Sequence, residues 1–295
     1  MATTLDHIVI LISPETLANL PPWLTNSFTI TPGGRHSNNI TENKLILFQD
    51  GVYIELIAFI EGTSPDIRKA TRWGRREEGE VVDFALTLLR DESKKGTFNP
   101  EEVFEDGVQK AVAGADTGFT YQDPVPGGRV TPDGVELRWA VAVPKKEGEG
   151  PVEGELPFWC LDRTPRNWRV PFRDVPGRAE HASGVVGVAG VEVLVKGGER
   201  FKELVKAYAA FLGEGVSEGS STGWKLGAPE GQRLGGLSSL KVTLSGEKPP
   251  LTQDGTDDGL VRISLKLFTT GASKTISGEI APGKTLSIKL IHTNP

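Results

Sequence analysis

The segment Gly51-Val-Tyr-Ile-Glu-Leu-Ile-Ala-Phe59 has the pattern of a buried strand, with a glutamate at its centre. Side chains alternate along a strand, so Tyr53, Glu55 and Ile57 share one face and the intervening apolar residues share the other. An unpaired carboxylate removed from water costs several kcal/mol or becomes protonated. We therefore expect Glu55 to face a cation, a set of hydrogen-bond donors or a cavity. It is either a structural carboxylate in a wet groove or beside an arginine, or a metal ligand or catalytic base.

The composition is that of a globular protein with many turns. The 295 residues allow two domains, or one domain enlarged by a repeat. Hydrophobic residues make up 37% and charged residues 24%, and 36 glycines and 20 prolines favour short strands over long helices. The net charge of −6 is spread along the chain, which gives no reason to expect nucleic acid or an anionic membrane as a partner.

The cysteine content and the N-terminus indicate a cytoplasmic protein. The single cysteine, Cys160, excludes an internal disulfide and a zinc site built from several cysteines. The N-terminus leads almost directly into an apolar run at residues 5–12 that is too short to span a bilayer and lacks a basic region before it.

Outward from Glu55, the first 60 residues predict the order β-α-β-β-β. The expected strands are 5–12, 28–31, 44–48 and 52–59, with a helix at 14–20, a turn at Pro32-Gly-Gly-Arg35 and a hairpin turn at 50–51. The same order follows between residues 81 and 162, where Pro126-Gly-Gly-Arg129 repeats the earlier motif in the same place. The repetition indicates an internal duplication.

A third unit is expected at residues 187–268, followed by hairpin-like segments. We therefore predict an α+β fold of repeated βαβββ modules: residues 1–166 form a cup of two paired modules, 167–180 connect, and 181–295 form a third module. Two such modules pair edge to edge around a shared concavity. A third module without a partner would leave a sheet edge exposed, which the C-terminal hairpins or a homodimer could cover.

The motifs around the first and fourth strands resemble the vicinal oxygen chelate superfamily, and more narrowly its glyoxalase-like branch. The residues that carry the resemblance are Leu5-Asp-His7-Ile-Val, Gly33-Gly-Arg-His36 with Thr41 and Asn43, Tyr53-Ile-Glu55-Leu, Pro157-Phe-Trp and His181-Ala-Ser-Gly. The resemblance covers roughly residues 1–195 and is most specific in the first 60. It implies that His7 and Glu55 stand at the metal-ligand positions of the superfamily.

The second half departs from the superfamily pattern. Aligning Leu5-Asp-His7 with Val82-Asp-Phe84 places a phenylalanine where a second ligand is expected, and residues 156–162 hold no glutamate matching Glu55. The candidates for a third ligand are His36, His181, Asp162 and Cys160. Two histidines and one carboxylate would suit a divalent iron, manganese, zinc or nickel ion.

The resemblance implies a small-molecule enzyme in which a divalent metal at His7 and Glu55 chelates the substrate through two adjacent oxygens. Lyase or isomerase chemistry fits this arrangement, with Glu55 also exchanging protons and His36 or His181 as third ligand or general base. Two alternatives stay open: a metal-free protein that binds or sequesters a small molecule, favoured by the missing second-half ligands, and an extradiol-type dioxygenase, which needs iron.

Two further groups of side chains have either a structural role or a role in substrate binding. Arg163, Arg166 and Arg169 either pair with nearby acids or form a basic strip for an anionic substrate. Trp73, Trp159 and Trp168 either pack in the core or line an apolar pocket.

Overall fold

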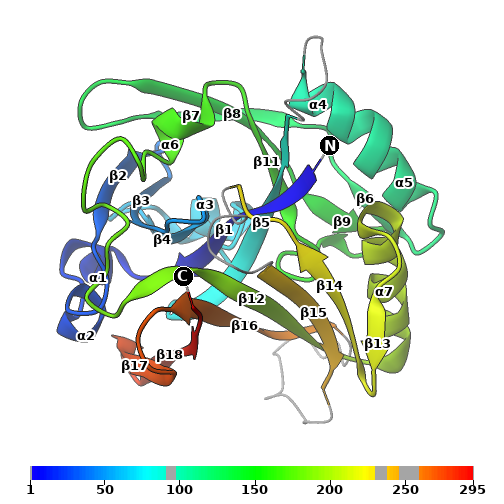
Figure 1. The fold of residues 1–295 in the computed structure, drawn as a ribbon. Helices are drawn as coiled ribbons and strands as arrows, with labels where there is room; N and C mark the ends of the chain where they lie inside the picture. Colours follow the sequence, from blue (N-terminus) through cyan, green and yellow to red (C-terminus); the bar gives the residue numbers. More distant parts are fainter. Residues whose placement is uncertain (1, 91–97, 230–237, 246–258, 295) are drawn as a thin grey trace.

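The computed structural model describes residues 2–90, 98–229, 238–245 and 259–294 (Figure 1). Their strands form three sheets of eight, three and seven strands. The two large sheets are each built from βαβββ units, so the predicted fold class is confirmed.

The first module forms one end of the eight-stranded sheet. Its elements are β1 (Ala2–Leu11), α1 (Pro14–Ala18), α2 (Pro22–Thr25), β2 (Thr31–Arg35), β3 (Thr41–Leu47) and β4 (Tyr53–Phe59). Ser13 begins α1 by accepting a hydrogen bond from the Thr16 N–H, and Pro14 occupies its first turn. The strands lie in the order β2-β3-β4-β1, with β1 parallel to β4.

The structure corrects the local assignment of one motif. The sequence pattern predicts a strand at 28–31 and a turn at Pro32-Gly-Gly-Arg35, but these four residues lie within β2, which begins at Thr31. A proline lacks an N–H and is tolerated in β2 because this strand is at the edge of the sheet. Two adjacent glycines and a proline are stronger signals for a turn than for a strand, so the pattern was misleading here.

The second module continues the same sheet. Its elements are β5 (Glu80–Leu89), α4 (Pro100–Val103), a π-helical turn η1 (Phe104–Gln109), α5 (Lys110–Ala113), β6 (Phe119–Tyr121), β7 (Val125–Val130), β8 (Glu136–Ala142) and β11 (Phe158–Asp162). Strands β9 (Pro144–Lys146) and β10 (Gly150–Pro151) form the small sheet with β6, and α3 (Pro65–Ala70) lies between the modules.

The two modules join in two places, at the centre of the sheet and at its edges. Strands β1 and β5 pair antiparallel at its centre. At its edges, β2 and β7 approach each other: the Ser37 N–H donates to the Gly128 carbonyl at 2.9 Å, and His36 and Arg129 form a β-bridge. The sheet therefore curls almost into a closed barrel, and its concave face encloses a space.

The C-terminal sheet repeats this arrangement. Its elements are β12 (Val185–Lys196), α7 (Gly198–Leu212), β13 (Val216–Glu218), β14 (Ser221–Leu226), β15 (Ser238–Leu244), β16 (Gly259–Thr269), β17 (Lys274–Ala281) and β18 (Lys284–His292). Strand β12 is parallel to β15, as β1 is to β4, and antiparallel to β16, as β1 is to β5. Strand β18 is parallel to β16 and antiparallel to β17.

The third module therefore ends at β15, and β16–β18 form a reduced fourth module that pairs with it. This corrects the expectation that residues 260–268 close the third module and that it has no partner. The missed strand is β13, whose three side chains are all exposed and show no apolar alternation. The domain boundaries at residues 166 and 180 remain a prediction.

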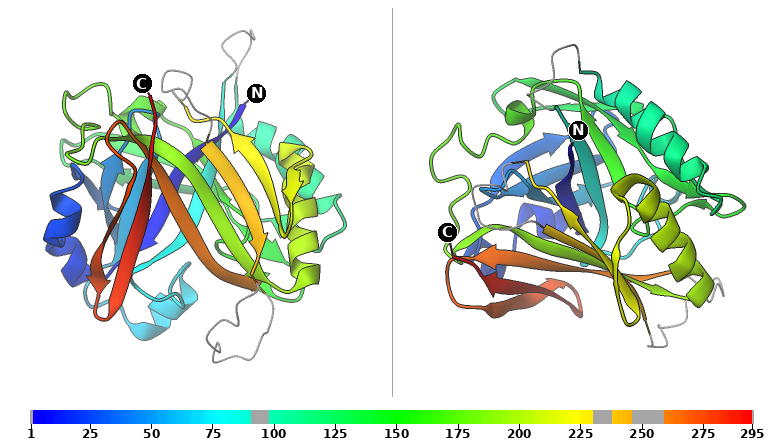
Figure 2. Two further views of the ribbon diagram at one scale, coloured as in Figure 1. Left: turned by 60° about the horizontal axis from the view of Figure 1, so that its bottom comes forward. Right: turned by 45° about the vertical axis from the view of Figure 1, so that its right-hand side comes forward.

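The two large sheets share one apolar core. It combines the convex face of the first sheet with side chains of β12, β15, β16 and α7. Figure 2 shows the C-terminal strands lying across β1 and β5. Ile54, Leu56 and Ala58 of β4 face this core, whereas Tyr53, Glu55 and Ile57 line a pocket on the other side, as their alternation predicts.

His181 attaches the connection between the second and third modules to the first. Its Nε2–H donates to the Leu47 carbonyl at 2.9 Å, its Nδ1 accepts the Thr29 N–H at 3.1 Å, and the ring packs edge-on against Phe28 and Phe48. Both nitrogens are used, so the ring is held as a neutral imidazole. Burial lowers the pKa of His181 to about 4.

This pKa predicts acid lability that a substitution removes. Between pH 6.5 and pH 4 His181 is protonated in the unfolded chain but not in the folded protein, where its pKa is lower. The stability provided by this residue therefore falls as the pH falls. Relative to His181→Gln, the wild type should lose about 2 kcal/mol of unfolding free energy between pH 7 and pH 4.5. Urea unfolding followed by circular dichroism at the two pH values measures this.

The comparison with the variant also removes an opposite effect. Burial raises the pKa of Asp50 to about 6, against the N–H groups of Val188 and Val52 that its carboxylate accepts, so the folded state takes up this proton first and gains stability as the pH falls. Asp50 is present in both proteins, so its contribution cancels in the difference between their unfolding free energies. A stability difference that is the same at both pH values would contradict the role of His181.

Candidate functional site

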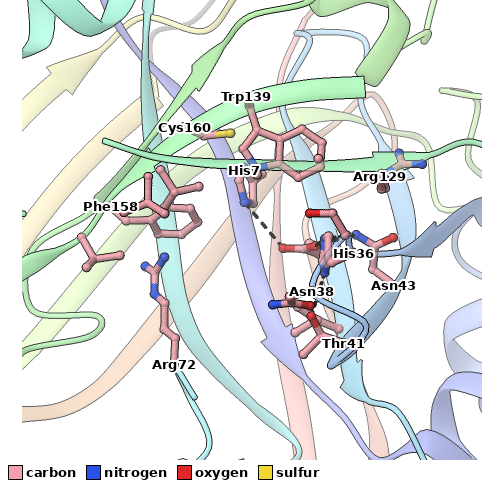
Figure 3. A pocket seen from close by; sticks show the side chains of 18 of the residues that line it. His7, His36, Asn38, Thr41, Asn43, Arg72, Arg129, Trp139, Phe158 and Cys160 are labelled. Atoms are coloured by element: carbon pink, nitrogen blue, oxygen red, sulfur yellow. Dashed lines mark hydrogen bonds and ion pairs between the residues drawn. The ribbon is translucent and has the colours of Figure 1, made fainter. Parts of the chain in front are cut away.

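The concave face of the first sheet surrounds a pocket of about 350 Å³ (Figure 3). Much of its wall is apolar and comes from four strands and the segment after α3: Leu45, Ile57, Trp73, Trp139, Val141 and Phe158. The polar side chains gather on the first module, around His7, His36, Asn43 and Glu55. A pocket of this size with a few convergent polar groups is typical of a small-molecule site.

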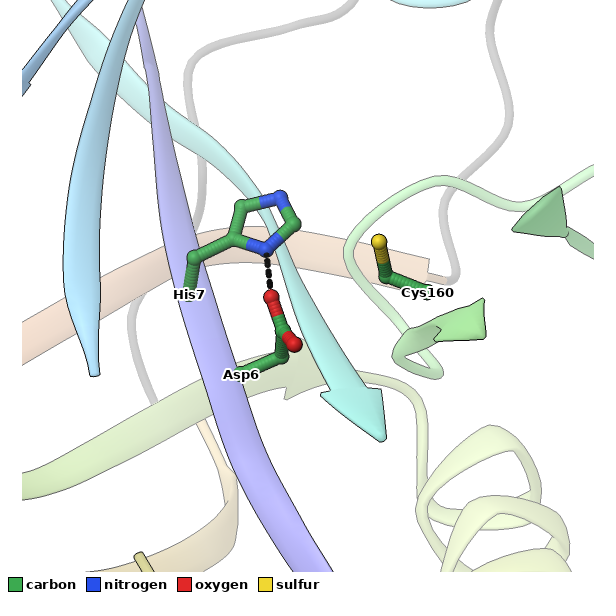
Figure 4. Close-up of side chains that lie close together, drawn as sticks. All are labelled: Asp6, His7 and Cys160. Carbon is green, nitrogen blue, oxygen red and sulfur yellow. Dashed lines mark hydrogen bonds and ion pairs between the residues drawn. The ribbon is translucent and has the colours of Figure 1, made fainter. Parts of the chain in front are cut away.

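A bulge in β1 aims His7 into this pocket. Leu5 pairs with Leu86 and His7 with Ala85, so Asp6 is an extra residue in the strand. The Asp6 Oδ1 and His7 Nδ1 lie 2.5 Å apart (Figure 4). The carboxylate accepts the Nδ1–H, which leaves the Nε2 lone pair free and directed toward Glu55, whose Oε2 is 3.6 Å away. The ring is further held by stacking on Tyr53, with centroids 4.6 Å apart.

Asp6 is itself held by the two arginines at the ends of the short helix α6 (Arg166–Arg169). Arg169 donates from Nη1 and Nη2 to the two Asp6 oxygens at 2.9 Å each, and Arg166 also bonds to Oδ2. Burial alone would raise the pKa of Asp6, but the charges of Arg166 and Arg169 and the bond from His7 outweigh it and hold this pKa well below its usual range. Asp6 is therefore a permanent anion that fixes the tautomer of His7.

Glu55 is held from the opposite side by the amide of Asn43. Glu55 is 6% exposed, and the Asn43 Nδ2 donates to its Oε1 at 2.5 Å. The Asn43 Oδ1 accepts the Gly34 N–H at 3.1 Å. A Cβ at Gly33 would lie 1.9 Å from that oxygen, so the glycine leaves the space in which the amide is seated. The repeated Gly-Gly motif thus serves the site in this half of the sheet.

His36 completes the polar group. Its Nε2 lies 3.5 Å from Glu55 Oε1, and its Nδ1 lies 2.7 Å from the Thr41 hydroxyl. Burial lowers the pKa of His36 against the opposing charge of Glu55, so the imidazole is neutral at neutral pH. The structure therefore brings together three residues singled out in the sequence, His7, His36 and Glu55.

The other sequence candidates are placed differently. His181 lies outside the pocket with both nitrogens bonded, so it has no access to Glu55. Asp162 accepts two hydrogen bonds from Arg169. Cys160 lines the pocket and lies with Asp6 and His7 in a cluster whose potential ligand atoms are within 4.8 Å, but burial raises the pKa of its thiol well above the ordinary value and Asp6 is already bonded to arginine.

The structure also corrects the alignment of the two halves. Ile8 pairs with Phe84 at the centre of the β1–β5 ladder, and His7 and Asp83 occupy equivalent positions on either side of it. Asp83, not Phe84, is therefore the counterpart of His7. The signal in the sequence is the match of His7-Ile-Val-Ile with Asp83-Phe-Ala-Leu, one residue away from the expected alignment.

The second half-site holds an arginine. Asp83 is fully buried and accepts hydrogen bonds from the Arg72 Nη2 at 2.6 Å and the Trp73 Nε1 at 2.8 Å. Phe158 pairs with Ala85 as Glu55 pairs with Val9, so it occupies the position equivalent to Glu55. The Arg72 guanidinium lies 3.8 Å from the centre of the Phe158 ring. This half therefore offers a cation and an aromatic ring where the first half offers a histidine and a carboxylate.

The arginines and tryptophans that the sequence singled out lie in different environments. Arg163 bonds to Glu101, and Arg166 and Arg169 bond to buried acids, so none of the three forms a free basic strip. Trp73 lines the pocket, Trp159 packs in the main core and Trp168 is largely exposed. The pocket residues Arg72, Trp139 and Arg129 were not recognised in the sequence; for Arg129 the signal was its place in the repeated Pro-Gly-Gly-Arg motif.

Comparison with known proteins places this architecture. A family model described as a glyoxalase-like domain matches residues 5–209. A solved structure of a hypothetical protein from Staphylococcus aureus has a TM-score of 0.64 at 13% identity, over 98% of this chain and 99% of that chain. A mutant 4-hydroxymandelate synthase from Streptomyces coelicolor has a TM-score of 0.48 at 10% identity, over 99% of this chain and 92% of that chain. No curated protein matches the chain.

No helix among the described residues is long and apolar enough to cross a membrane.

The charge network around His7 predicts a large stability effect. Asp6→Asn removes the negative charge without changing the side-chain volume and leaves Arg169, which is 3% exposed, without one of its two carboxylates. The unfolding free energy should fall by about 3–5 kcal/mol, because a buried charge loses its partner. Urea unfolding at pH 7 measures it.

The matched control is Glu42→Gln, which breaks an ion pair between exposed Arg35 and half-exposed Glu42 at 3.3 Å. This change should cost less than about 1 kcal/mol. Equal losses in the two variants would show that the Asp6 network is not the stabilising element described here.

Proposed function

The chain belongs to the glyoxalase-like domain family, as its motifs implied, and we propose that its pocket is the active site of a metal-dependent enzyme acting on a small molecule. The observation that carries the proposal is the pair formed by His7 Nε2 and Glu55 Oε2. They face each other at 3.6 Å in an otherwise largely apolar pocket, and both are held in place from behind.

The residues present fit a divalent cation. His7 offers a free lone pair on Nε2 because its Nδ1–H donates to the Asp6 carboxylate, an arrangement common behind metal-bound histidines. Glu55 offers a carboxylate that is buried and has a single hydrogen-bond donor, Asn43. One nitrogen and one carboxylate suit zinc, iron, manganese or nickel, with His36 available as a third ligand.

A divalent ion at His7 and Glu55 would supply Lewis acidity to two adjacent oxygens of a substrate. His36 would take a proton from the carbon beside them. Its Nδ1–H donates to Thr41, so Nε2 carries the lone pair and is neutral at the working pH because burial lowers the pKa of His36. Asn43 keeps Glu55 in position, and Trp73, Trp139 and Phe158 would give the reacting carbon an apolar surrounding. Lyase or isomerase chemistry follows from a proton acceptor beside a bound pair of oxygens.

One observation favours a second candidate, a metal-free protein that binds a small molecule. In the second half-site Phe158 and the Arg72–Asp83 pair stand where further ligands would be required, so the site has ligands from one module only. Such a protein would use the same apolar walls without catalysis.

Elemental analysis of protein purified without chelator separates the candidates. Wild type should contain about one divalent ion per chain, and His7→Ala and Glu55→Ala should each lose it, because each removes one of the two ligands that the pocket offers. His36→Gln should keep the ion while losing activity if His36 acts as the base.

The control is His292→Ala, which changes an exposed histidine at the end of β18 and should leave the metal content unchanged. Circular dichroism verifies that each variant is folded. If the wild-type protein binds no metal after incubation with iron, manganese, nickel and zinc, the enzyme proposal is wrong and the binding protein is favoured. If it binds iron and consumes oxygen in turnover, a dioxygenase is favoured. Metal loss from His36→Gln would make this residue a ligand.

A further inference from the structure

Arg129 is a buried cation in the pocket wall that has no carboxylate partner among the described residues. It lies on β7, is 6% exposed and lines the pocket close to His36, with which it forms a β-bridge. Within the part of the chain that the structure describes, its one hydrogen-bond acceptor is the Gly33 carbonyl, 3.1 Å from Nη1, and no carboxylate oxygen lies within 4 Å of its guanidinium.

The other buried arginines of the described residues differ in this respect. Arg169 bonds to both Asp6 and Asp162, and Arg200 contacts Glu155 and Glu149. Even Arg72, which shares the pocket with Arg129, is paired with Asp83. A guanidinium removed from water without a counter-ion is costly, and the pKa of Arg129 is lowered mainly by that burial. A residue of this kind is a ready site for an anion.

The chemistry of the anion follows from the surroundings. A guanidinium presents five N–H donors in a planar fork, and one of those on Arg129 is used by Gly33. The remaining edge matches the two oxygens of a carboxylate. A phosphate carries more charge and would require further cations, but the other two arginines that line the pocket are already paired, Arg72 with Asp83 and Arg169 with Asp6 and Asp162. Other walls of the pocket are the rings of Trp73, Trp139 and Phe158, which suit an apolar body of ring size.

We propose that Arg129 binds the carboxylate of the substrate, so that this pocket takes small apolar carboxylic acids with the carboxylate anchored beside His36. The assignment of a substrate class rests on the proposed function, but the binding subsite itself does not. Figure 3 shows Arg129 on the same side of the pocket as His36, with which it forms a β-bridge. Because the His36 Nε2 is 3.5 Å from the Glu55 Oε1, the anchored end of a ligand would lie close to Glu55.

Calorimetric titration with matched probes tests the subsite. Benzoate, phenylacetate and 3-phenylpropionate are compared with their uncharged primary amides, in protein treated with chelator and in protein loaded with zinc. At least one acid should bind tenfold or more tighter than its amide in both preparations, since a charge-assisted pair replaces a neutral contact.

Arg129→Gln should abolish this preference while leaving the amide affinity unchanged, and Arg129→Lys should retain part of it. The control is Arg138→Gln, an exposed arginine on the paired strand β8 that does not line the pocket and should keep the full preference. Acids that bind no better than amides, a preference that survives Arg129→Gln, or tighter binding of phenyl phosphate than of every acid would overturn the proposal. The chelator-treated protein tests the Arg129 subsite without a metal, so this result can be interpreted even if the protein binds no metal. Conversely, if Arg129 does not bind a carboxylate, the metal analysis is unaffected.

Discussion

The buried ion pair between Asp6 and Arg169 is the constraint on which the arrangement of the pocket depends. Arg169 bonds to Asp6, Asp162 and the Tyr53 hydroxyl, so one guanidinium joins β1, β4 and the end of β11. Asp6 in turn orients His7, and Tyr53 stacks on the same ring. The position of one nitrogen atom in the pocket is thereby determined by contacts from three strands.

The features that could be predicted from the sequence are those set by strand periodicity. The alternation around Glu55 correctly separated the pocket face of β4 from its core face, and the repeated order of elements revealed the duplicated sheet. The pairing of His7 with Glu55 was implied by the family resemblance, and the two side chains approach each other because β1 and β4 are neighbours.

The remaining features depend on irregularities that periodicity does not encode. The bulge at Asp6 puts two consecutive side chains on the pocket side of β1, and a matching register shift in β5 makes Asp83 the counterpart of His7. Strand β13 carries no apolar pattern, so the reduced fourth module was hidden. His36 and Arg129 meet only because two edge strands that are far apart in the sequence approach each other and close the sheet. No local sequence pattern predicts this closure.

The meeting of β2 and β7 has a consequence for stoichiometry. With β1 and β5 paired at the centre and β2 and β7 in contact at the edges, both halves of the pocket come from the same polypeptide. The described side chains that line the cavity come from both modules of one chain, so the pocket proposed as the active site can form within a single copy of the protein. Association of copies would multiply identical sites without creating them, so a ligand should saturate the protein at one equivalent per chain whatever the size of the assembly.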